Sequence, residues 1–543
     1  MAELGPEKRI LLAFALSFLV LVVWSRYLQK KSPPAPVPVT PAPTAMVEEP
    51  APTPPSEVEA PAERLRPGRA PTGQKIGREA REIVVESDVA RIVFSTQGAV
   101  VKSWTLKDYK NAPGDDSEPL DLVHPDASAE LGYPLSFALA DPEREQALNQ
   151  ALFVASREEA ELRAPVELTF EYNDGQVAAA KRFRVLDAYV IELETELFEE
   201  GRRVEHGIAW RGGFGDASLD TSWADLQVVW RAPDGVERKR AQSIGEGENE
   251  TFAGPFAYAG LEDRYFAAVF LPDKPAASGS QLRLAARRLS WTPEGAAKPQ
   301  PVVHLSVAWP AGSPTRLFVG PKAFDVLKQV QPAGSLRALD EMVDFWWGFA
   351  FIAKPIFLGM RWLHDHWIPS YGWAIVLLTL VINMGLFPLK WKSMQSAWKM
   401  QKIAPQMRAI QEKYKKYRFN DPRKQQMQQE LMGLYRQHGV NPLGGCLPML
   451  LQIPFFYAFY MVLSKAIELR HAPWLWIPDL SVRDPYYILP VVMTLSMYIS
   501  TKMTPMTTTD PTQQKMMSLM PLFFGFLFLT FSAGLVLYWM VSN

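Results

Sequence analysis

The sequence predicts a multidomain membrane protein: an N-terminal transmembrane anchor, an antiparallel β-sandwich outside the membrane, and a C-terminal α-helical core of five spans with a cytoplasmic helical hairpin. Three observations predict this architecture. Uncharged apolar runs occur near both ends of the chain, short alternating apolar segments fill the region between them, and residues 390–440 are strongly basic. At 543 residues, the chain is also too long for a single hydrophobic core.

The N-terminal part is predicted to be an anchor followed by a linker. Residues 10–24 are apolar except for Ser17, and no small-residue cleavage site follows them. We therefore interpret residues 1–31 as an uncleaved transmembrane anchor rather than a signal peptide. Thirteen of the 46 prolines lie in residues 33–71, so residues 32–72 are expected to form a semi-extended tether.

The middle of the chain is predicted to be a β-sandwich over residues 73–335. Short segments rich in Val, Phe, Trp and Tyr alternate with polar residues, and Asn173-Asp174-Gly175 and Pro233-Asp234-Gly235 supply turn chemistry. No paired acids or histidine set demand catalysis, so a packed scaffold is the simplest interpretation. Cys446 is the only cysteine, which excludes an internal disulfide and a multi-cysteine zinc site.

Residues 336–369 are aromatic and apolar but interrupted by charges and a proline, which predicts an interfacial amphipathic helix rather than a span. His364 and His366 are two residues apart and fall on different faces of such a helix. We therefore predict no metal site there, and the sequence suggests no cofactor.

The last part, residues 370–543, is predicted to hold five spans. The runs begin at Tyr371, Leu447, Tyr486, Met516 and Ala533. Because short loops rich in Lys and Arg stay in the cytoplasm, residues 390–440 are placed inside, the N-terminus inside and residues 32–369 outside. The last run, residues 533–543, is too short to cross about 30 Å of hydrocarbon, so we expect the protein to continue beyond it.

Residues 390–440 are predicted to form a hairpin of two helices. Apolar residues recur at spacings of three and four, Pro405 is placed near the start of the first helix, Asp421-Pro422 begins the second, and Gly439 ends it. The segment has twelve Lys and Arg against three acids. Two interpretations stay open. The excess of positive charge can reflect only the cytoplasmic orientation of the segment, or it can form a surface that binds RNA or anionic lipid. The basic residues at the predicted tip are Lys413, Lys415, Lys416, Arg418, Arg423 and Lys424.

Four motifs resemble one family in combination. They are Asn-Pro-Leu-Gly-Gly-Cys-Leu-Pro at 441–448, Asp-Pro-Tyr-Tyr-Ile-Leu-Pro at 484–490, Asp510-Pro511 with Gln-Gln-Lys at 513–515, and Gly-Leu-Val-Leu-Tyr at 534–538. Together they resemble the YidC family. Residues 98–106 and 318–321 are similar to the outer domain of its Gram-negative members.

The resemblance implies a membrane protein insertase and chaperone of the bacterial inner membrane, with the sandwich in the periplasm. It implies a core that surrounds a polar groove open to the cytoplasm and to lipid. Nascent membrane proteins would be the clients, and the Sec translocon, the ribosome and anionic lipids would be partners of a monomer. No catalytic residue is implied.

The family pattern also assigns candidate residues. The polar groove would be lined by Asn383, Thr379, Gln452, Thr494, Tyr538 and Trp539. An apolar slide for the client would consist of Met449, Phe455, Phe456, Phe526 and Phe528. Asn383 stands where the family has an arginine, and two interpretations stay open: a groove residue, or a hydrogen-bonding residue between helices.

Two other classes of function are weighed against insertion. A secondary transporter or channel with a large periplasmic domain would also have polar residues in its spans, but it would usually show several intramembrane charges or repeated halves. A membrane enzyme is suggested only by Ser396 and Lys399 in a Ser-x-x-Lys spacing on a basic helix, without the rest of such a site. We therefore predict that the protein is not an enzyme.

Overall fold

The protein is described by a computed structural model. The residues that it describes are 73–114, 116–217, 225–273, 282–292, 299–309, 314–333, 335, 337–343, 349–417, 421–439, 447–503 and 511–543. The predicted anchor and linker, Arg418, and the first six residues of the motif at 441–448 lie outside these ranges.

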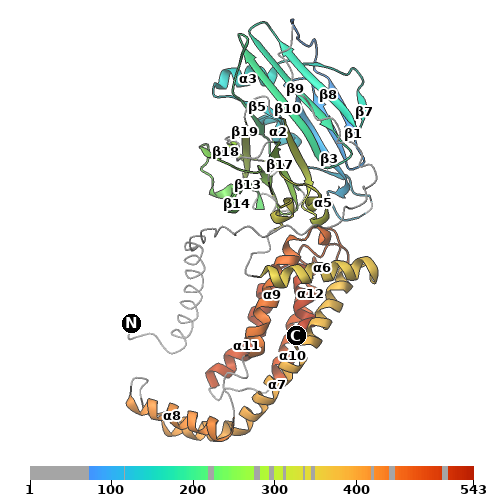
Figure 1. Ribbon diagram of the computed structural model, residues 1–543. Helices are drawn as coiled ribbons and strands as arrows, with labels where there is room; N and C mark the ends of the chain where they lie inside the picture. Colours follow the sequence, from blue (N-terminus) through green and yellow to red (C-terminus); the bar gives the residue numbers. More distant parts are fainter. Residues whose placement is uncertain are drawn as a thin grey trace, which may run out of the picture. The chain divides into compact units, whose positions relative to one another are not determined.

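The β-rich domain predicted from the alternating segments is present and contains three sheets (Figure 1). The first has the order β4 (Pro119–Asp121), β3 (Val100–Lys110), β2 (Ala90–Ser95), β1 (Glu82–Glu86) and β7 (Glu161–Arg163). The second has the order β14 (Gly235–Arg240), β13 (Gln227–Ala232), β16 (Ala259–Glu262), β17 (Phe266–Pro272), β20 (Thr315–Pro321), β10 (Val190–Glu199), β9 (Val177–Val185), β8 (Val166–Asn173) and β6 (Val154–Ala155), with β11 (Arg202–Arg203) beside β10. The third has the order β15 (Asn249–Gly254), β18 (Leu282–Trp291), β19 (Gln300–Ala308), β12 (Gly207–Trp210) and β5 (Ser136–Ala138). Among the described strands, all pairings are antiparallel except that of β1 with β7.

The β8–β9 hairpin shows how local sequence sets the register. The Asn173 side chain accepts a hydrogen bond from the Gly175 amide at 2.9 Å, and Gly175 has φ +99°, a conformation that favours glycine. Asp174 accepts from the amides of Gln176 and Val177, each at 2.8 Å. The turn fixes which residues of β8 and β9 face each other, and so which side chains enter the core.

Aromatic side chains join the sheets into one core. Phe94 of β2 lies 4.9 Å from Phe183 of β9, ring centre to ring centre, so the first sheet packs on the second. Trp104 of β3 lies 6.5 Å from Trp210 of β12, which brings in the third sheet. All four rings are buried, and such a core is stabilised mainly by the removal of apolar surface from water.

Short helices accompany the sheets. They are α2 (Pro125–Leu131), α3 (Pro142–Gln150), the 3-10 helices η1 (Ala241–Ser243) and η3 (Leu339–Met342), and α5 (Phe324–Gln329). Leu327 of α5 and Leu339 of η3 form a second apolar cluster with Val269 and Phe318, which lie on β17 and β20. The second sheet is therefore covered by apolar residues on both faces.

The C-terminal region is helical. Its elements are α6 (Ala350–His366), α7 (Tyr371–Lys413), α8 (Pro422–Gln437), α9 (Leu447–Lys465), the 3-10 helix η5 (Ile467–Leu469), α10 (Ile488–Met503), α11 (Pro511–Phe528) and α12 (Ala533–Ser542). Within the described residues, α7 alone is long and apolar enough to cross a membrane by length and composition, while α10, residues 515–528 of α11, and α12 are shorter apolar helices.

Helix α7 corrects one expectation about the hairpin. The sequence placed Pro405 near the start of a separate helix, but α7 continues without interruption from Tyr371 to Lys413 and contains both Pro388 and Pro405. A proline inside a helix removes one backbone hydrogen bond, and here the favourable packing of neighbouring residues outweighs that loss. The first predicted span and the first hairpin helix are therefore one element.

The second half of the hairpin follows the sequence prediction closely. Asp421 caps α8 by accepting a hydrogen bond from the Arg423 amide at 2.9 Å, and Gly439 follows the helix end with φ +59°. Ile403 and Met407 of α7 are buried in a cluster with Leu431, Leu434 and Tyr435 of α8. These are contacts between the two apolar stripes that the spacing predicted.

Helix α12 lies at the centre of the helical region. It contacts α7, α9 and α10, and residues 533–538 are all buried. Helix α6 contacts α7 and α9 through one buried face that includes Ile356 and Met360, and it runs across their ends (Figure 1). Its other face exposes Phe351 and Trp362, as an amphipathic helix requires.

Candidate functional site

Two of the predicted groove residues lie on α7 in different settings. Thr379 is only 1% exposed, and its hydroxyl donates to the carbonyl of Ile375 at 2.7 Å, within its own helix. Thr379 is therefore a packed residue whose hydroxyl donor is already used. Asn383 is half-buried and accepts a hydrogen bond from Lys390 Nζ at 2.6 Å. Lys390 is a polar partner that the sequence analysis did not identify.

A second group joins α9 to α12. Gln452 Nε2 donates to the Tyr538 hydroxyl at 2.6 Å and to Ser542 Oγ at 2.9 Å. The Tyr538 ring stacks on Phe459 of α9, with centroids 4.0 Å apart and planes 17° apart. Tyr538 is 1% exposed. These contacts form a brace between two apolar helices, in which a buried ring and a shared amide hold the pair in register.

Trp539 and Thr494 form two further environments. Trp539 is half-buried and makes an edge contact with Phe456 at 4.9 Å between centroids. Thr494 donates to the Pro490 carbonyl at 2.7 Å within α10. A Cβ added to Gly525 of α11 would lie 2.2 Å from Thr494 Oγ1, so this glycine allows α10 and α11 to approach closely. The six proposed groove residues thus occupy several local settings.

The proposed slide residues also separate. Phe526 is 77% exposed, whereas Phe528 is 1% exposed and packs in the helical core against Trp539 and Phe531. Residues two apart on a helix point about 200° apart, so Phe528 packs in the core while Phe526 is exposed, and the place of Phe528 in the client slide stays a prediction. Phe455 and Phe456 are half-buried beside the same core. Met449 lies in the first turn of α9.

The basic tip of the hairpin is partly neutralised. Lys413 pairs with Glu430 of α8 at 2.7 Å, and the Tyr414 hydroxyl donates to the same carboxylate at 2.8 Å. The guanidinium of Arg423 lies over the Tyr417 ring at 4.5 Å. Lys415, Lys416 and Arg423 are exposed, and Lys424 is half-buried. Lys413 is thus paired across the hairpin, although its side chain is 60% exposed, as Lys415, Lys416 and Arg423 are also exposed.

Two histidines of α6 have separate partners. His364 Nδ1 lies 3.0 Å from Asp365 Oδ1, and its ring stacks on Tyr371 at 3.9 Å. His366 Nδ1 lies 3.1 Å from the carbonyl of Trp362. Within the part of the chain that the structure describes, no group of three or more His, Cys, Asp or Glu is placed to hold a metal ion.

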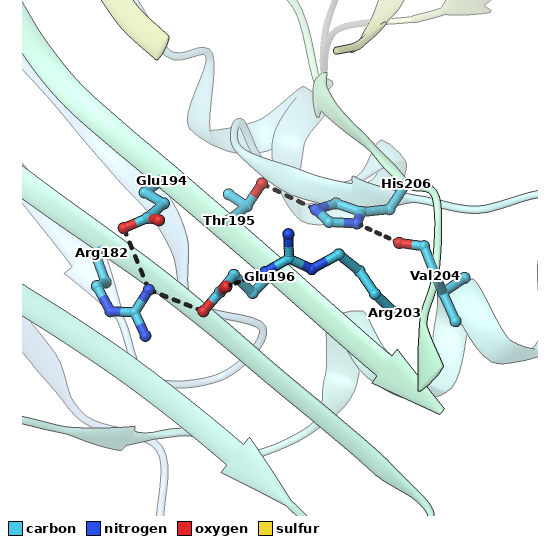
Figure 2. A network of polar contacts seen from close by, with 7 residues as sticks. All are labelled: Arg182, Glu194, Thr195, Glu196, Arg203, Val204 and His206. Atoms are coloured by element: carbon cyan, nitrogen blue, oxygen red, sulfur yellow. Dashed lines mark hydrogen bonds and ion pairs between the residues drawn. The ribbon is translucent and has the colours of Figure 1, made fainter. Parts of the chain in front are cut away.

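The β-rich domain contains a buried ionic network that sequence analysis missed (Figure 2). Glu194 and Glu196 of β10 are fully buried. Arg182, which faces Glu194 across β9 and β10, donates to Glu194 at 3.2 Å and to Glu196 at 3.0 Å, and Arg203 donates to Glu196 at 2.7 Å. The sequence signal for this network is the pair of opposite charges, Arg182 and Glu194, on two neighbouring strands. It can be recognised only when the register of β9 against β10 is known.

His206 lies next to this network. Its Nδ1 faces the Val204 carbonyl at 3.1 Å and its Nε2 faces Thr195 Oγ1 at 2.9 Å, so the ring donates from Nδ1 and accepts at Nε2 (Figure 2). Burial lowers the pKa of His206 below its ordinary value, and the nearby cations Lys181 and Arg203 act in the same direction. His206 is therefore a neutral structural residue at neutral pH.

A hollow of about 420 Å³ lies on the third sheet. Its larger lining side chains are Leu139, which follows β5, Thr251 and Phe252 of β15, and Arg283 and Leu284 of β18; the remaining lining residues, from β5, β12, β15, β18 and β19, are small. Arg283 pairs with Glu205 at 2.9 Å. The hollow presents no convergent polar set for chemistry.

Comparisons with known proteins identify the family. Residues 82–358 match the family model described as YidC periplasmic domain, and residues 362–543 match the model described as 60Kd inner membrane protein. A "Membrane protein insertase YidC" from Syntrophus aciditrophicus (strain SB) is 33% identical, covering 99% of this chain and 97% of the relative. The chain belongs to the YidC family of membrane protein insertases.

Other relatives agree with this assignment. A protein of the same name from Geotalea uraniireducens (strain Rf4) is also 33% identical, over 99% of this chain and 97% of the relative. A solved structure titled "Active YidC insertase crystal structure with the first transmembrane domain resolved" has 19% identity and a TM-score of 0.34, covering 86% of this chain and 92% of that one. The assignment rests on the sequence relatives and the two family models.

The family assignment settles the class of function. The protein is a membrane protein insertase of the inner membrane, its substrates are nascent membrane proteins, and it is not an enzyme. It combines a periplasmic β-rich domain with a C-terminal helical region. The transporter or channel alternative is not favoured.

Proposed function

We propose that the helical region inserts client segments through a polar, hydrated path along α7, α9 and α12. The observation that carries this proposal is a set of polar side chains in otherwise apolar helices: Asn383 with Lys390 on α7, and Gln452 with Tyr538 and Ser542 between α9 and α12. Polar groups in hydrocarbon cost several kcal/mol unless they are paired or hydrated, so they indicate a functional or structural requirement.

The mechanism requires no chemical energy from the protein. A wet path shortens the apolar barrier that a client's polar end must cross, and transfer of the client's apolar segment into lipid drives the process. In this proposal Asn383, Gln452, Thr494, Tyr538 and Trp539 keep the path polar or shape it. Thr379 and Tyr538 are both 1% exposed, so in this proposal Thr379 packs behind the path and Tyr538 shapes it by holding Gln452 in place. Phe455, Phe456, Phe526 and Met449 would guide the apolar part.

The proposed organisation follows the sequence boundaries. Residues 1–31 are the anchor, 32–72 the linker, 73–335 the periplasmic sandwich, 336–369 the interfacial segment and 370–543 the five-span core with hairpin 390–440. The N-terminus is placed in the cytoplasm and residues 32–369 in the periplasm, because the hairpin carries the excess of Lys and Arg.

The proposed partners besides the clients are the Sec translocon, the ribosome and anionic lipids, with the protein acting as a monomer. The exposed residues Lys415, Lys416 and Arg423 support contact with RNA or lipid phosphate, because cations at a helical tip attract polyanions. Lys413 is less available since it pairs with Glu430.

Reconstitution tests this proposal directly. The full chain in phospholipid vesicles should translocate the short tail of a single-span client without nucleotide, as measured by protection of the tail from added protease. Vesicles that lack the protein give the background. Insertion no faster than this background would contradict the proposal.

A further inference from the structure

The loop between α9 and α10, residues 466–487, packs on both the β-rich domain and the helical region, which belong to one compact unit. Ile467 of η5 is 4% exposed and is part of the apolar core of the β-rich domain. Leu469, two residues later, is buried in the core of the helical region. Because the β-rich domain is periplasmic, the α9–α10 loop lies on the periplasmic side of the helices.

Arg470 follows η5 and is buried against the β-rich domain. Its Nε donates to Asp216 Oδ2 at 2.7 Å, and its Nη2 lies 2.7 Å from the same oxygen and donates to the Lys110 carbonyl at 2.6 Å. The guanidinium carbon lies 5.7 Å from the centre of the Phe266 ring. The side chains of Arg470 and Asp216 are only 3% and 1% exposed. Removal of either partner would therefore leave a buried charge without its counterion.

The socket that receives Arg470 is built by the β-rich domain. Asp263 positions two of its parts: Oδ2 accepts from the Asp216 amide at 2.8 Å, and Oδ1 accepts from the Phe266 amide at 2.6 Å. Gly215, at φ +106°, lets the chain pass close to this carboxylate, because a Cβ there would lie 2.2 Å from Asp263 Oδ2. The anion and the ring that face Arg470 are thus fixed by contacts inside the β-rich domain.

Beyond Arg470, the α9–α10 loop covers the ends of two helices. The Val482 carbonyl accepts a hydrogen bond from the Ala533 amide at 2.7 Å, at the start of α12, where amides lack partners within the helix. The Trp474 ring lies on the first turn of α7, since a Cβ on Gly372 would come within 2.2 Å of it. Ala533 is 0% exposed in this arrangement. The loop therefore shields the outer ends of α7 and α12 from water.

The backbone of the loop is strained. His471, Leu475 and Tyr487 have φ values of +58°, +51° and +56°, which residues with a Cβ rarely adopt. Such conformations persist only where surrounding contacts hold them. Arg470 directly precedes the first of these residues, and Trp474 precedes the second. The strain favours a different loop conformation as soon as these contacts are broken.

We infer that Arg470 and Asp216 form a latch through which the periplasmic domain holds the α9–α10 loop closed over α7 and α12, and that the latch opens when a client's tail passes. The inference rests on the proposed function, because a tail that moves along α7 toward the periplasm meets the loop at the first turn of that helix. Arg470 is a positioning residue: it fixes the loop that covers the end of the path.

A single cysteine under the loop reports whether the latch is closed. In a Cys446→Ser background, Ala533→Cys places a thiol at a fully buried position beside the loop. The full chain is reconstituted in phospholipid vesicles, and a membrane-impermeant maleimide is added outside. Labelling requires opening, so its rate follows the opening equilibrium. Arg470→Gln and Asp216→Asn should each raise the rate at least about tenfold, as expected for loss of a hydrogen bond between charged groups.

Three further proteins separate the latch from general loosening of the domain. The double variant Arg470→Gln/Asp216→Asn should not multiply the two increases, because both changes remove the same contact. Arg182→Gln interrupts a buried ion pair of the same domain that does not involve the loop and should leave the labelling rate within about twofold. Arg283→Gln, in an exposed pair with Glu205, is a milder control and should have no effect.

A client provides the test of opening. Addition of a single-span client should speed labelling of the reporter protein that carries only Cys446→Ser and Ala533→Cys. The same client should have little further effect when Arg470→Gln is also present, since the latch is then already open. Insertion of the client is followed in parallel by protease protection of its tail.

Each result supports or overturns the latch. Labelling at the reporter rate in both Arg470→Gln and Asp216→Asn would overturn it, and so would an equal increase with Arg182→Gln. Insertion of the client without faster labelling of the reporter protein would overturn its opening by the tail. Failure of the unmodified protein to insert the client would instead contradict the proposed function, while labelling of the client-free variants would still decide whether Arg470 holds the loop.

Discussion

The brace between α9 and α12 gives a prediction whose magnitude follows from the structure. Tyr538→Phe keeps the ring stacked on Phe459 but removes the hydroxyl that receives the Gln452 amide. Gln452 can still donate to Ser542 at 2.9 Å. Hydrogen bonds between membrane helices contribute about 0.6 kcal/mol on average, so the free energy of unfolding should fall by about 0.5–1 kcal/mol.

Larger substitutions at the same position should cost more. Tyr538→Ala also removes a fully buried ring and should lower the free energy of unfolding by about 3–5 kcal/mol. Gln452→Leu removes both donated hydrogen bonds and leaves the Tyr538 hydroxyl without this donor, at a cost of about 1–3 kcal/mol. These differences separate the contribution of the ring from that of the hydrogen bond.

The assay is reversible unfolding in mixed detergent micelles, with a double-mutant cycle on Gln452→Leu and Tyr538→Phe. The two changes should be non-additive by about 0.5–1.5 kcal/mol, because they remove the same hydrogen bond. Strict additivity would refute the brace. So would equal effects of Tyr538→Phe and Tyr538→Ala, since the stacked ring would then contribute nothing.

Three further predictions concern other parts of the chain. Arg182→Met leaves two buried glutamates without this cation and should lower the free energy of unfolding by about 3–5 kcal/mol. Chemical denaturation measures this change, and a decrease below about 1 kcal/mol would contradict the buried network. His206 has a lowered pKa when folded, so its contribution to stability is present above about pH 6.5 and is lost as the pH falls below that value. Between pH 7.5 and 5.5, the free energy of unfolding of the unmodified chain should therefore fall by at most about 1.4 kcal/mol more than that of His206→Gln. Identical pH profiles of the two proteins would contradict a lowered pKa for His206. Asp421→Ala should reduce the stability of α8 by about 1 kcal/mol, seen as faster amide exchange in its first turn, while unchanged exchange there would argue against the cap.

Features that depend on local chemistry could be predicted from the sequence. The Asn173-Asp174-Gly175 turn, the Asp421 cap and the Gly439 helix end each involve a side chain and backbone groups only a few residues apart. The apolar stripes containing Ile403 and Leu431 were also visible, because helical periodicity repeats along the chain. In the turn and at the helix ends, the groups that contact each other are neighbours in sequence; in the stripes, residues of one face recur at helical spacing.

Features that depend on direction or long-range register could not be predicted in this way. Apolar Phe526 and Phe528 look alike in sequence, but only one is exposed, because rotation of α11 against its neighbours decides which side faces inward. Arg182 finds Glu194 only through the register of β9 with β10. Lys390 belongs by sequence to the basic segment, yet its flexible side chain reaches Asn383.

The correction at Pro405 has a similar cause. Proline lowers the intrinsic preference for a helix, and the sequence therefore suggested a boundary. In the structure, the packing of Met400, Ile403 and Met407 against α8 keeps α7 continuous on both sides of the proline. Tertiary contacts here outweigh local propensity, and the first helix of the hairpin consequently continues the apolar part of α7 without a break.

The central claim is that a client passes along the polar side of α7, and site-specific photo-crosslinking tests it most directly. A crosslinker at Asn383 should trap a nascent membrane protein, whereas one at Val381, which is exposed on a face about 200° away, should trap mainly lipid. Thr379 is a poor probe position because it is buried. Strong client crosslinking at Asn383 with little at Val381 is the predicted result, and the reverse pattern would contradict the claim.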